Sequence, residues 1–124
     1  MKRHLIRFLI GTVLLSVLAC AGGNPADAIA GKTFVREGGG CGGDFTVTLH
    51  TDGTYEYYEG FLSSYIGRGD WTVEDGTLTM VERGGYDSVF RFSVANGELR
   101  YRAEDSDGFL YVDVADGDRF LPLD

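Results

Sequence analysis

Histidine and cysteine are scarce in this sequence, and their scarcity argues against several kinds of site. The 124 residues include two histidines, His4 and His50, and two cysteines, Cys20 and Cys41. A zinc site draws most of its ligands from these two residue types. A catalytic Ser-His-Asp or Cys-His set needs a histidine beside its nucleophile, and no short sequence motif in this chain contains such a set. We therefore expect no catalytic residue, no metal centre and no cofactor.

Basic residues are also few. The chain has 11 lysines and arginines against 19 aspartates and glutamates, a net charge of -8. Residues 1–19 contain three of the basic residues and none of the acidic ones, so the rest of the chain is more acidic still. Phosphate backbones would repel such a domain, which argues against nucleic acid as a partner. An anionic membrane surface would repel it too.

A long apolar run occurs only near the start of the chain. Lys2, Arg3 and Arg7 precede the apolar run from Phe8 to Ala19. A permanent membrane-spanning helix needs about 20 apolar residues, and this run is shorter. A basic segment, a short apolar segment and a small residue before a cleavage point are typical of a secretory signal peptide.

The last four residues of that segment resemble the lipobox of bacterial lipoproteins. They read Val17-Leu18-Ala19-Cys20. The resemblance implies cleavage before Cys20 and a diacylglyceryl group on its sulfur, so the protein would be exported and held to the cell membrane or outer membrane by lipidated Cys20. An ordinary secretory peptide with an incidental cysteine is the alternative. We expect a signal peptide over 1–19, a lipidated N-terminus and flexible tether over 20–30, and one domain over 31–124.

The domain shows the alternation of apolar and polar residues that is typical of strands. In one stretch Phe45, Val47 and Leu49 alternate with polar residues, and no stretch sustains a helical period. Glycine is frequent, with 19 in the chain. Strands are predicted at Lys32–Glu37, Asp44–His50, Thr54–Gly60, Asp70–Glu74, Thr77–Arg83, Ser88–Val94, Glu98–Glu104, Phe109–Val114 and Arg119–Leu123.

Short turns join these strands. Asx-Gly pairs, which tolerate the left-handed backbone of tight hairpins, recur at Asp52-Gly53, Asp75-Gly76, Asn96-Gly97, Asp107-Gly108 and Asp116-Gly117. The pattern predicts an all-β, antiparallel up-and-down meander of about eight strands. Such a meander usually closes into a barrel, because closure removes exposed strand edges.

This layout resembles that of small bacterial lipocalin-like β-barrel lipoproteins. The residues that carry the resemblance are Gly31-Lys-Thr-Phe34, Asp52-Gly-Thr-Tyr55, and Gly69-Asp-Trp71 before Asp75-Gly-Thr-Leu78. The resemblance implies a small lipocalin-like barrel and an exported setting.

An aromatic group around the third strand is the main candidate site. Tyr55 and Tyr57 share one face of that strand, so Tyr58 points to the other face, and the loop towards Trp71 follows. Apolar rings with polar tips beside an arginine suit a ligand cleft or a protein contact. The candidate binding residues are Tyr58, Phe61, Tyr65 and Arg68. In the alternative, the rings fill the barrel and cap its end.

Three other features could carry chemistry. Cys41 lies among glycines and could be a dimer bridge, a reactive thiol or a tolerated loop cysteine; we favour the last. The acidic segments 104–108 and 113–118 could ligate calcium, although Asp and Gly are also what hairpin turns require. Glu56, Glu59 and Asp70 could serve an envelope enzyme as acid and base.

Taken together, the sequence predicts a membrane-anchored extracytoplasmic lipoprotein that is not an enzyme. Its barrel would bind an unknown small apolar ligand or contact an envelope protein. A structural or inhibitory envelope lipoprotein is the alternative, and an enzyme that uses the carboxylates is a further one.

Overall fold

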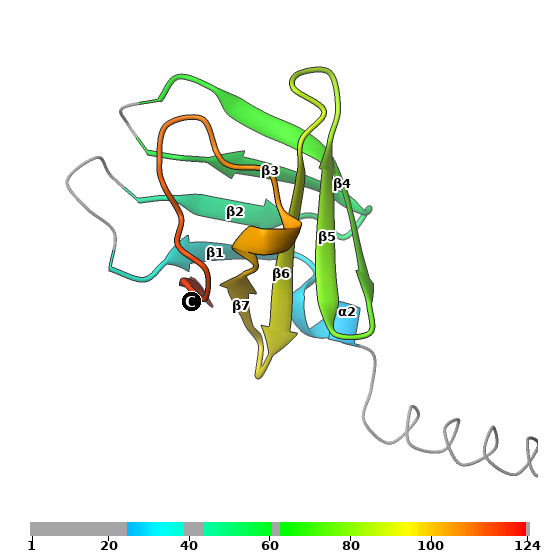
Figure 1. Ribbon diagram of the computed structural model, residues 1–124. Helices are drawn as coiled ribbons and strands as arrows, with labels where there is room; N and C mark the ends of the chain where they lie inside the picture. Colours follow the sequence, from blue (N-terminus) through cyan, green and yellow to red (C-terminus); the bar gives the residue numbers. More distant parts are fainter. Residues whose placement is uncertain (1–24, 39–43, 61–62, 124) are drawn as a thin grey trace, which may run out of the picture.

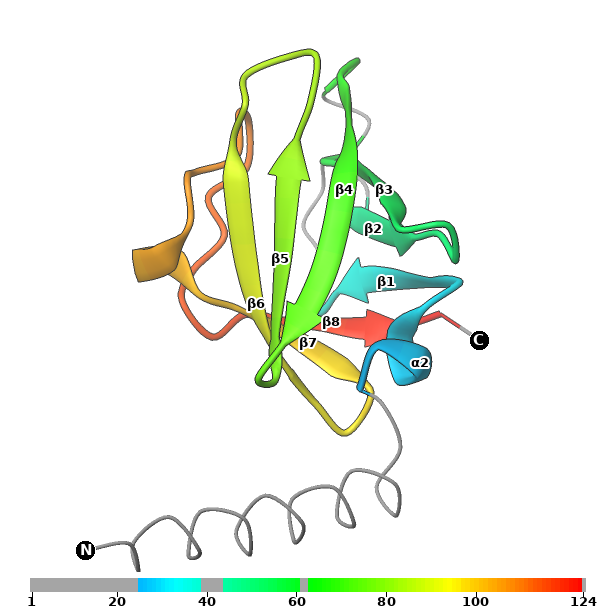
Figure 2. The same cartoon turned by 90° about the vertical axis from the view of Figure 1, so that its right-hand side faces the viewer.

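Eight antiparallel strands follow one another in chain order and close into a barrel, with β1 paired to β8. The computed structural model describes residues 25–38, 44–60 and 63–123. Figures 1 and 2 show the barrel from two sides. This confirms the predicted all-β up-and-down meander and is consistent with a lipocalin-like barrel. The elements are α2 (Pro25–Ile29), β1 (Lys32–Arg36), β2 (Thr46–Leu49), β3 (Thr54–Tyr58), β4 (Ile66–Glu74), β5 (Thr77–Glu82), β6 (Val89–Ala95), β7 (Glu98–Tyr101), the 3-10 helix η1 (Ala103–Asp105) and β8 (Arg119–Pro122).

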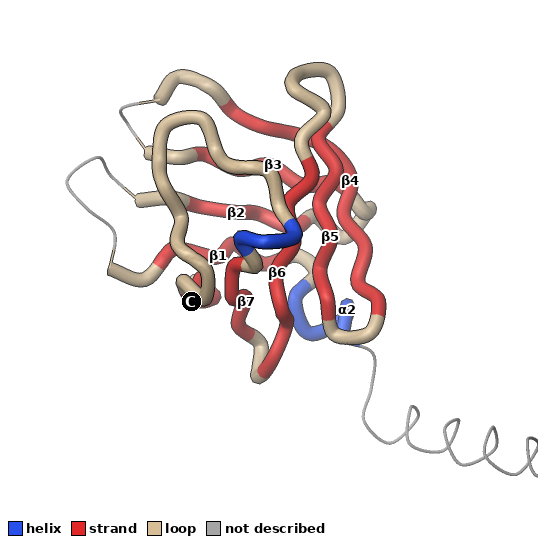
Figure 3. The backbone as a smooth tube through the Cα atoms, in the orientation of Figure 1, coloured by secondary structure: helices blue, strands red, loops and turns tan. Residues whose placement is uncertain are grey.

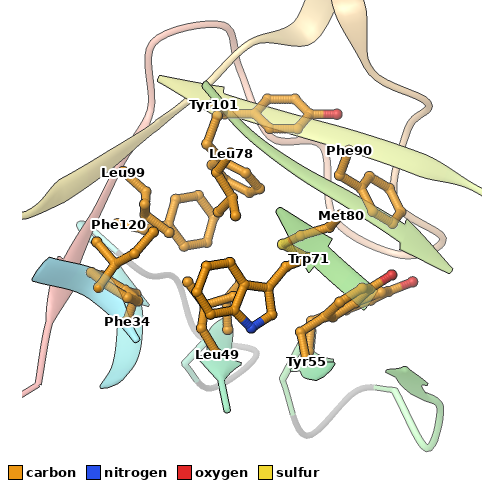
Figure 4. Close-up of a cluster of buried hydrophobic side chains, with 14 of the residues drawn as sticks. Phe34, Leu49, Tyr55, Trp71, Leu78, Met80, Phe90, Leu99, Tyr101 and Phe120 are labelled. Carbon is orange, nitrogen blue, oxygen red and sulfur yellow. The ribbon is translucent and has the colours of Figure 1, made fainter. Parts of the chain in front are cut away.

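The barrel interior is filled by the alternating inward side chains of the strands. Figure 4 shows how side chains such as Trp71, Leu78 and Phe120 meet there. The Trp71 indole N–H donates to the His50 carbonyl oxygen at 2.9 Å, so this buried ring has its polar atom satisfied. Trp71 is buried. An eight-stranded barrel is just wide enough for side chains to fill it, and these side chains do so.

Strand β4 forms a corner of the barrel and is longer than predicted. Its first half pairs with β3 and its second half with β5, and the two halves overlap at Gly69 and Asp70. A Cβ atom on Gly69 would lie 2.0 Å from the Val81 carbonyl oxygen, so only glycine allows β5 to approach so closely. A Cβ on Gly67 would similarly overlap the Tyr57 ring. These inward glycines hide the apolar alternation, so the strand was predicted to begin at Asp70 although it begins at Ile66.

The two ends of the barrel differ. Tight turns join β2 to β3, β4 to β5 and β6 to β7, and they lie along the right and lower sides of the barrel in Figure 1, as α2 does. Longer connections join β3 to β4, β5 to β6 and β7 to β8 at the opposite end. We call this the long-loop end.

Helix α2 corrects part of the expected tether. Residues 25–29 are helical, and the side chain of Ile29 is 0% exposed within the core. An isolated five-residue helix is unstable in water, so its formation here depends on burying Ile29. Pro25 suits the first position of the helix, where no backbone N–H is needed. The expected signal helix and Cys20 lie outside the described residues.

The predicted strand at Phe109–Val114 is wrong. Residues 106–118 instead form an irregular loop between η1 and β8, drawn in tan in Figure 3. The carboxylate of Glu59 accepts hydrogen bonds from the backbone N–H groups of Leu110, Tyr111 and Val112 at 3.0, 2.8 and 2.9 Å. A side chain therefore satisfies the donors that a neighbouring strand would have satisfied.

Candidate functional site

A row of four charged side chains crosses the outer face of β3, β4 and β5. Arg68 Nε donates to Glu56 Oε2 at 3.0 Å, and Arg83 Nε lies 2.9 Å from Asp70 Oδ2. Arg68 and Arg83 face each other across the β4–β5 pair, because the Arg83 N–H donates to the Arg68 carbonyl at 2.9 Å. Like charges directly opposite each other on a sheet are unfavourable. Glu56 on β3 pairs with Arg68, and Asp70 on β4 pairs with Arg83, so the two carboxylates offset the repulsion between the arginines.

These arginines border a surface cleft of about 320 Å³. The cleft is lined by His50, Thr54, Tyr55, Glu56, Arg68, Gly69 and Arg83. His50 Nε2 lies 3.5 Å from Glu56 Oε1, so the imidazole extends the polar wall formed by the charged row. The His50 side chain is 42% exposed. The volume is at the lower end of the range for small-molecule sites.

The four candidate binding residues do not share one surface. Tyr58 and Arg68 point to the outside of β3 and β4, close to each other in the strand register. Tyr65 instead packs towards the interior, where its ring contacts those of Tyr57 and Tyr86 with centroids 6.3 and 5.6 Å apart. Phe61 lies outside the described residues. Of the four, Arg68 is the one that lines the cleft.

Two buried carboxyl groups lie at the long-loop end: Glu59, which the sequence offered as an acid or base, and Glu82, which the sequence did not single out. Glu82 is the last inward residue of β5 and is 1% exposed. The hydroxyl of Tyr65 donates a short hydrogen bond to Glu82 Oε2. That bond, followed by burial, raises the pKa of Tyr65 to about 12. Burial, followed by the charge of Glu82, raises the pKa of Tyr55 and of Tyr57.

The second buried carboxyl group, Glu59, holds the loop across this end of the barrel. Its hydrogen bonds to residues 110–112 place Phe109 over the core. The Phe109 ring stacks on Phe90 at a centroid distance of 4.2 Å and meets the Tyr57 ring edge-on at 5.1 Å. The loop therefore acts as a lid that completes the aromatic core.

The strand pattern contained a signal for both carboxyl groups. Glu59 continues the inward series of Tyr55 and Tyr57, and Glu82 continues that of Leu78 and Met80. A charged residue at an inward position is rarely buried without a partner. The signal marks the position but not the partner, because the partners lie far along the chain.

The acidic segments considered for calcium are engaged in local contacts. Asp107 accepts the Val89 N–H at 2.8 Å, Asp116 accepts the Ala103 N–H at 2.9 Å, and Asp118 pairs with Arg36 at 2.8 Å. Among the described residues, no group of three or more His, Cys, Asp or Glu side chains could hold a metal ion. Cys41 lies outside the described residues.

Comparison of the chain with protein-family models, with curated proteins and with solved structures found no match. In the part of the chain that the structure describes, no helix has the length and apolar character needed to cross a membrane.

Proposed function

We propose that this protein is a non-enzymatic binding module that is exported and anchored to a membrane through lipidated Cys20. Its ligand is a small molecule that carries an acidic group and binds in the cleft on β3, β4 and β5. The observation that carries this proposal is the pair of facing arginines, Arg68 and Arg83, at the border of the cleft. This ligand is charged, whereas the aromatic residues alone suggested an apolar ligand.

The energetics of the charged row support an acidic ligand. Both guanidinium groups are about two-thirds exposed, and exposed ion pairs contribute only about 0–1 kcal/mol each. A carboxylate or phosphate between the arginines would relieve their repulsion and could make paired hydrogen bonds with each guanidinium. The ligand would replace Glu56 and Asp70 as partners of the arginines. The free-energy cost of breaking those two ion pairs is small, because each contributes little.

Binding rather than catalysis is supported by the contacts of the carboxylates considered for an enzyme. Glu56 pairs with Arg68, Asp70 pairs with Arg83, and Glu59 is buried under the loop at residues 110–112. General acid and base groups need access to the same reacting atoms. These three carboxylates are instead each held by a separate partner.

The test of the cleft uses the full-length protein in detergent micelles. Acetate and inorganic phosphate, added at constant ionic strength, should shift the NMR signals of the Arg68 and Arg83 side-chain Nε–H groups. Arg68→Gln and Arg83→Gln should each weaken binding about tenfold or more, the loss of one charge-assisted contact. Arg100→Gln is the matched control, since Arg100 is exposed on β7, away from the cleft. The proposal would be overturned if Arg68→Gln and Arg83→Gln bound acetate and phosphate as tightly as the Arg100→Gln control.

The test of anchoring is independent of the ligand. In a bacterial host, wild-type protein should incorporate labelled palmitate and fractionate with membranes, and Cys20→Ser should do neither. A covalently attached acyl chain contributes about 0.8 kcal/mol per buried methylene, so more than one chain is a sufficient anchor. Membrane fractionation of Cys20→Ser without label uptake by the wild type would contradict lipidation.

Contact with an envelope protein is a second candidate function, and a different observation favours it. At the long-loop end Tyr86 and Tyr111 are 63% and 61% exposed, and Leu110, next to Tyr111 in the chain, is 40% exposed. Exposed aromatic residues of this kind often anchor protein contacts. A photo-crosslinking amino acid at Tyr86 or Tyr111 should then capture one defined partner, whereas the same group at Thr72 on the outer face of β4 should not.

A further inference from the structure

The buried carboxyl group of Glu82 has one oxygen without a partner. Oε2 accepts the hydroxyl of Tyr65, but no hydrogen-bond donor among the described residues reaches Oε1. Leaving a buried charged acceptor unpaired costs more than the net gain from a typical hydrogen bond. The inward position of Glu82 at the end of β5 thus needs an explanation other than stability.

A second unpaired polar atom lies on the neighbouring Tyr55. Its hydroxyl oxygen is buried and has no hydrogen-bond partner among the described residues. Tyr55 and Glu82 are both paired with Gly69 in the strand register, one from each side, so their inward side chains flank a residue that has no side chain. The charge of Glu82 also helps to raise the pKa of Tyr55. Figure 4 shows the Tyr55 hydroxyl pointing away from Trp71 and Leu49, towards the edge of the core. Both unpaired oxygens can accept a hydrogen bond.

The contrast with Glu59 shows that an unpaired oxygen is not general at this end of the barrel. Glu59 is also buried, yet both of its oxygens accept backbone N–H groups. The fold can therefore satisfy an inward carboxylate here when its role is structural. Glu82 keeps one oxygen available instead.

In the loop between β5 and β6, an exposed glycine packs directly against Glu82 and Tyr65. Gly84 and Gly85 are exposed, and a Cβ atom on Gly85 would lie 2.4 Å from the Tyr65 hydroxyl oxygen and 3.3 Å from Glu82 Oε2. Gly85, which has no side chain, therefore covers the Tyr65 hydroxyl and the Glu82 carboxyl group. The rings of Tyr57, Tyr65 and Tyr86 adjoin one another beside it. Their π faces favour a cation.

We propose that Glu82 Oε1 and the Tyr55 hydroxyl oxygen form a second binding site, which takes a small protonated amine. The ammonium N–H groups donate to the two unpaired oxygens, and the tyrosine rings surround its methylene groups. The net charge of -8 attracts cations to the protein. Tyr55 also lines the cleft, but Glu82 points into the barrel whereas Arg83 points out of it, so this site does not depend on the function proposed for the cleft.

The test compares methylammonium with tetramethylammonium on the full-length protein in detergent micelles. Both are cations, but tetramethylammonium has no N–H to donate. Methylammonium should bind at least tenfold more tightly in calorimetric titrations at constant ionic strength, and Glu82→Gln should remove that preference. Equal affinity for the two cations, or an unchanged preference in Glu82→Gln, would overturn the proposal.

A second variant covers the case in which Glu82→Gln does not fold. Tyr55→Phe keeps the ring and removes the unpaired oxygen, so it should weaken methylammonium binding several-fold while leaving tetramethylammonium binding unchanged. Tyr101→Phe is the matched control, because its hydroxyl already donates to the Asp107 carbonyl at 2.8 Å. Absence of methylammonium binding in the wild type would mean that only water occupies the site, and it would refute the proposal.

Discussion

Replacing Glu59 should loosen the loop across the long-loop end of the barrel. Oε1 of Glu59 accepts the N–H groups of Tyr111 and Val112, and Oε2 accepts that of Leu110. In Glu59→Gln the amide oxygen can keep the first two bonds. The amide NH₂ then faces the Leu110 N–H, so two donors oppose each other and the third bond is lost.

The expected cost follows from these three bonds. A hydrogen bond to a charged group contributes about 1.5–3 kcal/mol, and water can reach part of this loop after the change. We expect Glu59→Gln to reduce the free energy of unfolding by about 1–3 kcal/mol, and Glu59→Ala by about 3–5 kcal/mol. Set against a typical total of about 5–15 kcal/mol, the second loss can unfold much of the protein.

Urea denaturation measures the global effect, and amide hydrogen exchange locates it. The amides of Leu110, Tyr111 and Val112 should exchange faster in Glu59→Gln, since they lose their common acceptor. Glu56→Gln is the matched control three residues earlier, because Glu56 is half-buried on the outer face and its ion pair with Arg68 contributes about 0–1 kcal/mol. The reasoning fails if the two glutamine variants are equally stable and the three amides exchange at wild-type rates.

Three further results are expected. Ile29→Ala should cost about 2–5 kcal/mol in urea denaturation, because the helix would lose its buried anchor; a loss typical of the surface, within about 0.5 kcal/mol, would mean that the helix does not stabilise the barrel. Trp71→Ala should cost about 3–5 kcal/mol, whereas Tyr58→Ala on the outer face should stay within about 1 kcal/mol, and equal losses would contradict their placement. The Tyr65 phenol has its pKa raised from 10.0 to about 12, so its contribution to stability is complete below pH 10 and is lost as pH rises through about 12. Phenolate absorbance should show Tyr65 titrating earlier in Glu82→Gln, and an unchanged titration would contradict the hydrogen bond.

The sequence by itself determined the class and order of the strands. Alternating residues such as Phe45, Val47 and Leu49 set which face of a strand is buried, and Asx-Gly pairs set where hairpins turn. Both signals are local, so they can be read without knowing the partner strand. The local signals gave a wrong prediction at Phe109–Val114, where the distant Glu59 carboxylate, and not a neighbouring strand, accepts the backbone N–H groups. They also failed at α2, which forms because Ile29 reaches the core.

The candidate sites depended on the tertiary structure. Arg68 could be selected as a polar residue near aromatic rings, but its position opposite Arg83 follows from the β4–β5 register, which the corner at Gly69 sets. Glu82 was visible as a charged residue at an inward position. Its neighbours were decided by strand pairing, because Tyr65 donates to it from the loop before β4 and Tyr55 flanks Gly69 on the opposite side from Glu82. Side-chain alternation fixes the direction of each residue along its own strand, whereas neighbours across the barrel are fixed only when the strands pair.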